Sequence, residues 1–129
     1  MALNQFGAVM TFAIELEGRL AEFYEKAAQD HPPHTAEFKQ RAEDARKRRK
    51  KIEISRTRDV TEITLEPIDG LDEANYQIDL SQTDIKTVNM AEEVVKQFYN
   101  DATPKINVRE SRKVLERCLK DHVGLKPIT

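Results

Sequence analysis

The sequence predicts an all-α fold, a four-helix bundle made of two helical hairpins that a long crossover connection joins. Three observations support this prediction. Apolar side chains recur at steps of three and four residues in four stretches, prolines fall between the first and second and between the third and fourth of these, and the chain has only four glycines and five prolines. A length of 129 residues suits one domain, here 1–129.

The first hairpin is expected between Asn4 and Arg58. Asn4 is a plausible N-cap of a helix that runs to about Gln29, before Pro32-Pro33. Its stripe consists of Phe6, Met10, Ala13, Leu20, Tyr24 and Ala27. Thr35 is the plausible N-cap of a second helix, which ends somewhere in Ile54–Arg58.

The second hairpin follows a connection that extends to Asp79. Ser81-Gln82-Thr83-Asp84 resembles a capping box and predicts a third helix to about Thr103. Asn107, with Glu110 three residues later, predicts the start of a fourth helix, and Gly124 its end. The third stripe is Ile85, Val88, Glu92, Val95, Tyr99 and Ala102.

Two carboxylates interrupt the apolar stripes. Glu17 and Glu92 each stand in the frame Glu-x5-Phe-Tyr, so the first and third helices repeat one pattern. A carboxylate inside a bundle is costly to desolvate unless a cation or hydrogen bonds meet it. The alternative is that both glutamates lie beside the seam and reach water. Tyr24 and Tyr99 are expected in the core with hydrogen-bonded hydroxyls.

Three segments resemble the rubrerythrin branch of the ferritin-like proteins. They are AIELEGRLAEFYEKAA (13–28), GLDEANYQIDL (70–80) and MAEEVVKQFYNDA (90–102). The resemblance implies a di-iron site with one Glu from each of the first and third helices and Glu-x-x-His from each of the others. It also implies a homodimer.

The implied ligand set is incomplete. Glu17, Glu92 and His122 match ligand positions, whereas the chain has Ala45, Arg48 and Leu119 at the other three. Alanine and leucine have no donor atom for iron, and arginine has no lone pair to offer. We therefore expect no cofactor, with a single iron or zinc ion held by the three remaining residues as the alternative.

Arg48 is the candidate substitute for the metal charge. A guanidinium fork entering the seam would neutralise Glu17 and Glu92 through bidentate hydrogen bonds. In the alternative interpretation, Arg48 is solvated like the rest of the basic run Arg46–Lys51.

Several classes of function are disfavoured. The net charge of −2 indicates no global attraction to nucleic acid, so Arg46–Lys51 is expected to be an ordinary solvated helix face. No run of about 18 apolar residues predicts a membrane span. The first residues lack the basic region of a secretion signal. The single cysteine, Cys118, permits no internal disulfide and favours the cytoplasm.

The sequence thus predicts a non-catalytic binding or assembly protein with a degenerate di-iron site. The alternative is a divergent metal-dependent oxidoreductase that uses Glu17, Glu92 and His122 for peroxide or O2 chemistry. No motif identifies a substrate or a protein partner.

Overall fold

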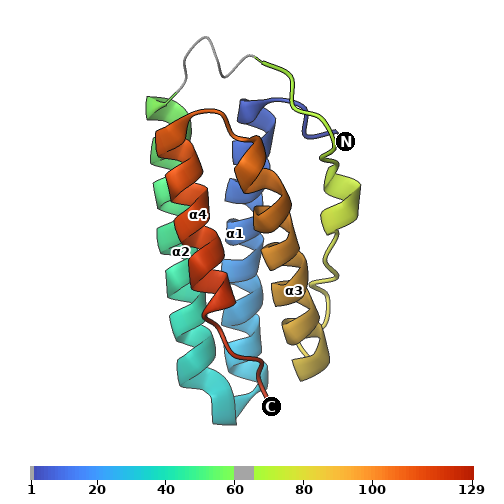
Figure 1. Cartoon of the computed structure of the whole chain (residues 1–129). Helices are drawn as coiled ribbons and strands as arrows, with labels where there is room; N and C mark the ends of the chain where they lie inside the picture. Colours follow the sequence, from blue (N-terminus) through green and yellow to red (C-terminus); the bar gives the residue numbers. More distant parts are fainter. Residues whose placement is uncertain (1, 60–65) are drawn as a thin grey trace.

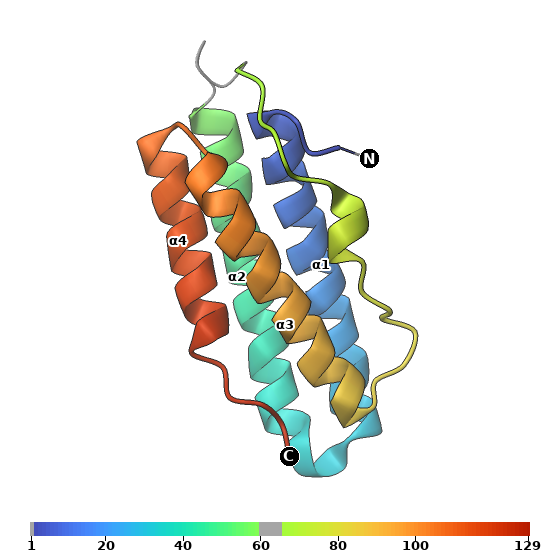
Figure 2. The same cartoon turned by 45° about the vertical axis from the view of Figure 1, so that its right-hand side comes forward.

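The computed structural model describes residues 2–59 and 66–129, and both ranges are all-α. The helices are α1 (Phe6–Asp30), α2 (Thr35–Arg58), α3 (Ile85–Ala102) and α4 (Arg109–Val123). They lie side by side, with their axes roughly aligned (Figure 1, Figure 2). Within the described ranges there is no strand, and an isolated bridge pairs Ala2 with Asp72. The predicted all-α class and the four helices are confirmed.

The predicted stripes form the core. The six stripe positions of α1 are all buried, and in α3 only Ile85, in the first turn, is partly exposed. The inward face of α2 consists of Phe38, Arg41, Ala42, Ala45, Arg48, Ile52 and Ser55. The inward face of α4 consists of Ser111, Leu115, Cys118 and His122. Several of these inward positions carry ionisable groups, and those groups assemble in the candidate site.

The helix starts differ from the predicted caps. α1 begins after Gln5, not Asn4, and α4 begins after Val108, not Asn107; neither helix has a side-chain cap. Asn107 instead donates to the Glu66 carboxylate over 3.2 Å. The cap of α3 is Asp84, which accepts from the Thr87 backbone amide, so the capping role predicted for Ser81 was wrong.

The turn between α1 and α2 is tight because Pro32–His34 form a single 3-10 turn. Thr35 is the first residue of α2 and not its N-cap. Its hydroxyl donates over 2.7 Å to the carbonyl of Ala28, near the end of α1. Thr35 therefore satisfies a terminal carbonyl of the preceding helix.

Part of the long connection before α3 is described, residues 66–84. It passes along the bundle from the end near the N-terminus to the opposite end, with a 3-10 turn at Glu73–Tyr76 (Figure 2). Tyr76 anchors it: its ring packs against Phe12 and Phe98, and its hydroxyl donates over 2.7 Å to Asp101. The rest of the predicted connection, residues 60–65, lies outside the described residues.

The last residues return across the bundle. The side-chain amide of Asn89 donates to the Ile128 carbonyl and accepts from the Ile128 amide, both at 2.9 Å. This places the C-terminal segment at the same end of the bundle as the α1–α2 turn (Figure 1). Of the helices that the structure describes, none has the combination of length and apolarity needed to cross a bilayer.

Candidate functional site

The two stripe carboxylates lie inside the bundle. Glu17 on α1 is 0% exposed and Glu92 on α3 is 5% exposed. The alternative in which they lie off the seam and reach water is therefore wrong. Two buried carboxylates require partners, because each loses its hydration when the helices pack.

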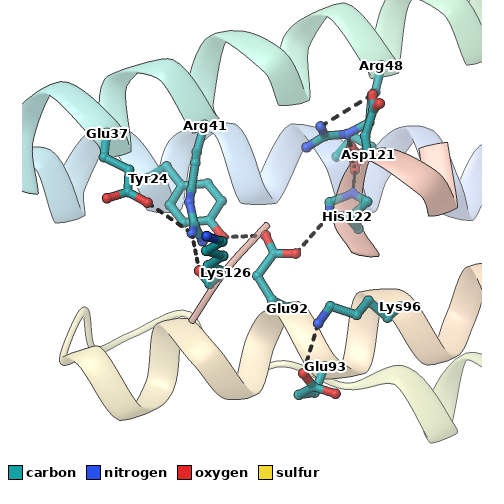
Figure 3. Close-up of polar contacts among 11 residues, drawn as sticks. Tyr24, Glu37, Arg41, Arg48, Glu92, Glu93, Lys96, Asp121, His122 and Lys126 are labelled. Atoms are coloured by element: carbon teal, nitrogen blue, oxygen red, sulfur yellow. Dashed lines mark hydrogen bonds and ion pairs between the residues drawn. The ribbon is translucent and has the colours of Figure 1, made fainter. Parts of the chain in front are cut away.

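His122 of α4 lies between them. Its Nδ1 is 2.7 Å from Glu92 Oε2 (Figure 3). Its Nε2 is 2.7 Å from Glu17 Oε1. Both ring nitrogens face carboxylate oxygens, which accept hydrogen bonds, so the ring satisfies both only as the imidazolium. Burial alone would lower the pKa of His122, but Glu17 and Glu92 outweigh it and raise that pKa above its usual value.

Arg48 of α2 completes the environment of Glu17. Its Nε donates to Glu17 Oε2 over 2.6 Å and to Oε1 over 3.1 Å. The guanidinium is buried, so the alternative of a solvated Arg48 is wrong. Burial alone would lower the pKa of Arg48, but the charge and hydrogen bonds of Glu17 outweigh burial and raise that pKa above its usual value. One part of the prediction needs correction, since Arg48 hydrogen-bonds Glu17 and makes no hydrogen bond to Glu92.

Glu92 is met from the other side by Tyr24 and Arg41. The Tyr24 hydroxyl donates to Glu92 Oε1, and Arg41 Nη1 donates to that hydroxyl over 3.3 Å. Burial opposes ionisation of Glu92, but the hydrogen bonds from His122 and Tyr24 hold its pKa below the usual value. Burial and the Glu92 charge raise the pKa of Tyr24, so the phenol stays protonated.

Arg41 links this interior network to the surface. Its Nη2 donates to the Lys126 carbonyl over 2.8 Å and contacts Glu37 over 3.2 Å (Figure 3). Arg41 is not among the site residues predicted from the sequence. The signal was available, because Arg41 precedes Arg48 by seven residues and two helical turns bring both side chains to one face.

Six buried side chains form one continuous chain of hydrogen bonds with an arginine at each end, which we call the core network. It consists of Arg48, Glu17, His122, Glu92, Tyr24 and Arg41. With His122 protonated and Glu37 included, three cations meet three carboxylates. The partners therefore supply inside the bundle the positive charge that the two glutamates require.

The repeated Glu-x5-Phe-Tyr frame is not used symmetrically. Tyr24 of the first frame donates to Glu92 of the second, but the Tyr99 hydroxyl has no hydrogen-bond partner among the described residues. The expected hydrogen bond of Tyr99 is therefore absent, whereas that of Tyr24 is confirmed. Arg48 and His122 are the hydrogen-bond partners of Glu17, and the Tyr99 ring stacks on the His122 ring with 5.6 Å between the ring centroids.

The donor set does not fit a di-iron centre. Ala45 is fully buried at one expected ligand position and Arg48 occupies another. Leu119 is only partly buried, and its neighbour Cys118 faces inward instead. In the described part of the chain, no three His, Cys, Asp or Glu side chains are arranged to hold a metal ion. A single ion on Glu17, Glu92 and His122 stays a prediction, and it would displace at least one hydrogen bond of the His122 ring.

The basic run of α2 divides into one buried and several exposed side chains. Arg46 contacts Glu25 at 2.9 Å, Lys47 contacts Glu43 at 3.7 Å and Arg49 contacts Glu53 at 3.0 Å. Arg48 alone within the run points into the core. The outward members are thus mostly engaged with acidic neighbours on the bundle surface.

Comparison of the chain with family models, with curated proteins and with solved structures gives no match.

Proposed function

We propose that this chain is a ferritin-like bundle, related to the rubrerythrins, whose degenerate di-iron site has become a metal-free charge network, and that it acts as a non-catalytic binding or assembly protein. The observation that carries the proposal is the His122 ring, with each nitrogen 2.7 Å from a different buried carboxylate. A proton on each nitrogen leaves no lone pair for a metal ion.

The difficulty of replacing the His122 proton by a metal ion supports this proposal. A cation entering between the carboxylates has to remove a proton from a ring whose pKa is raised, and it meets the Arg48 charge beside Glu17. The network therefore favours its own protons and guanidinium over a divalent ion. In the ferritin-like arrangement, the connection before α3 is the crossover between the hairpins, and α2 and α3 run in the same direction.

We also propose that the protein forms a homodimer and is located in the cytoplasm. The large apolar side chains of Met90 and Val123 are exposed and offer contact surface to a second copy. The only thiol, on Cys118, is buried, which suits a reducing compartment. Sedimentation equilibrium over a range of concentrations tests the dimer, and a monomer throughout the range contradicts it.

Metal analysis of protein purified without chelator tests the central proposal. We expect no stoichiometric iron or zinc after incubation with Fe2+ or Zn2+, and no peroxide turnover. Stoichiometric iron with peroxide turnover would support the alternative, a reduced Glu17/Glu92/His122 oxidoreductase, and would overturn the proposal.

A restored variant provides the matched positive control. The substitutions Ala45→Glu, Arg48→His and Leu119→Glu together rebuild Glu-x-x-His on α2 and on α4. If the frame is ferritin-like, this variant binds two iron ions per chain under conditions in which the unsubstituted protein binds none. A folded variant without iron would contradict the proposed frame.

A further inference from the structure

A cavity of about 410 Å³ opens between α2 and α4, where Arg48 of the core network approaches the surface. One face of each helix lines it: Arg48, Lys51, Ile54 and Arg58 from α2, and Glu110, Lys113, Val114, Arg117, Cys118 and Asp121 from α4. We call this the α2–α4 cavity. Its volume falls in the usual range for small-molecule sites, about 300–1,000 Å³.

The lining of the α2–α4 cavity is strongly basic. Five basic side chains face two acidic ones. Arg58 is engaged by Asp59 at 2.8 Å. Among the residues that the structure describes, no ion pair joins Lys51, Lys113 or Arg117 to a carboxylate, so their charges are available to a ligand.

Arg48 forms a buried part of the lining and has unused hydrogen-bonding capacity. Its side chain is only 5% exposed, and its Nη2 has no hydrogen-bond partner within the described ranges. Its Nη1 is 4.0 Å from Asp121 Oδ2, too long for a hydrogen bond. A buried guanidinium N–H without an acceptor is costly, and an anionic oxygen is the partner that it lacks.

We propose that the α2–α4 cavity binds a small organic molecule through a phosphate group. Phosphate oxygens accept from Arg48 Nη1, which lies on the side of the lining residue Asp121, and Lys113 and Arg117 of α4 neutralise the group together with Lys51. Several cations at one position suit a doubly charged phosphate better than a single carboxylate. The exposed Ile54 and the adjacent Val114 supply apolar wall for the rest of the ligand.

The inference deepens the proposed function and rests on it, because it uses the guanidinium that the proposed function places beside Glu17. It names the ligand class of the binding protein. Of the six positions that the resemblance assigns to metal ligands, that of Arg48 alone lines the cavity.

Backbone amide NMR with phenyl phosphate, inorganic phosphate and acetate tests the proposal at constant ionic strength. Phenyl phosphate is expected to bind most tightly, with shifts concentrated at residues 48–58 and 110–121. Equal affinity for acetate would overturn the phosphate class, and equal affinity for inorganic phosphate would overturn the organic ligand. Shifts spread over the outer face of α2 would overturn the cavity as the site.

Two double variants on α4 provide the matched comparison. Lys113→Gln with Arg117→Gln removes two charges from the cavity, and phenyl phosphate should bind roughly tenfold more weakly or worse. Arg112→Gln with Lys120→Gln removes two charges that do not line it and should leave the affinity unchanged. Equal losses in both double variants would refute the proposal.

The metal content of the same samples separates the two proposals. Metal-free protein that fails to bind phenyl phosphate rejects the cavity and leaves the proposed function intact. Protein with stoichiometric iron or zinc rejects the proposed function, whatever the phosphate result.

Discussion

Replacing Arg48 by methionine removes the guanidinium that meets Glu17. Glu17 is fully buried, and it accepts from Arg48 Nε at 2.6 and 3.1 Å. Removing one partner of a buried ion pair costs about 3–5 kcal/mol when the other charge is left uncompensated, and the loss should fall at the lower end of this range because Glu17 keeps its contact with His122. Domain stabilities are typically about 5–15 kcal/mol, so this loss is a large fraction of the whole.

The neighbouring residue is the matched control. Arg49 is exposed and contacts Glu53 at 3.0 Å, so Arg49→Met should cost less than about 1 kcal/mol. The assay is urea unfolding followed by far-UV circular dichroism. The variant Arg48→Lys retains a charge but loses the planar fork, so its loss should fall between those of the two methionine variants.

A double-mutant cycle with Glu17→Met isolates the pair. Each single variant leaves a buried charge without its partner, whereas the double variant removes both charges. The double loss should therefore be smaller than the sum of the single losses by about 2 kcal/mol or more. Additive losses, or an Arg48→Met loss equal to that of Arg49→Met, would refute the assignment of Arg48 to the core network.

Three further predictions concern the pH dependence of stability, the reactivity of the Cys118 thiol and the C-terminal segment. The raised pKa of His122 means that its contribution to stability is complete below about pH 6.5 and is lost as pH rises through the folded-state pKa. The lowered pKa of Glu92 means that its contribution is complete above about pH 4.3 and is lost on acidification. The urea midpoint of unfolding should thus decrease both below about pH 4.3 and above about pH 6.5. The variant His122→Asn should lose most of the decrease on the alkaline side. Burial, with Glu17 nearby, raises the pKa of the Cys118 thiol to about 12, so thiol reagents should react only after urea unfolding; rapid labelling of the folded protein would contradict its burial. Finally, Asn89→Ala removes both hydrogen bonds to Ile128, and hydrogen exchange should accelerate at residues 125–129 while α1 is unchanged. Unaltered exchange there would show that the two Asn89–Ile128 hydrogen bonds do not hold the C-terminal segment in place.

The helices could be predicted because each apolar stripe repeats with the period of an α-helix, as in α1 and α3. Their ends were predicted less well. Asn4 and Asn107 have good N-cap chemistry, yet the caps are Gln5 and Val108, one residue later, and both asparagines make contacts with the connection before α3 instead. Ile68, for example, donates to the Asn4 carbonyl over 2.8 Å. Such contacts join residues far apart in the sequence, and a local pattern does not contain them.

The site was predictable to the extent that its residues interrupt an apolar pattern. Glu17 and Glu92 stand out for that reason, and a register taken from Phe38 separates Arg48 from the five other basic residues around it. Arg41 has no mark of burial of its own on this charged helix, and only its spacing of seven residues from Arg48 places it on the same inward face. The division of partners, with Arg48 on Glu17 and His122 on both carboxylates, depends on relative helix rotation and had to be read from the structure.

The central claim is that the bundle interior holds protons and a guanidinium where the resemblance implies metal ions. The nitrogen NMR signals of the His122 ring, recorded at neutral pH before and after addition of Fe2+ or Zn2+, test it most directly. We predict that both ring nitrogens carry protons, with the shifts of an imidazolium, and that neither metal changes them. An unprotonated ring nitrogen that responds to stoichiometric metal would contradict the account.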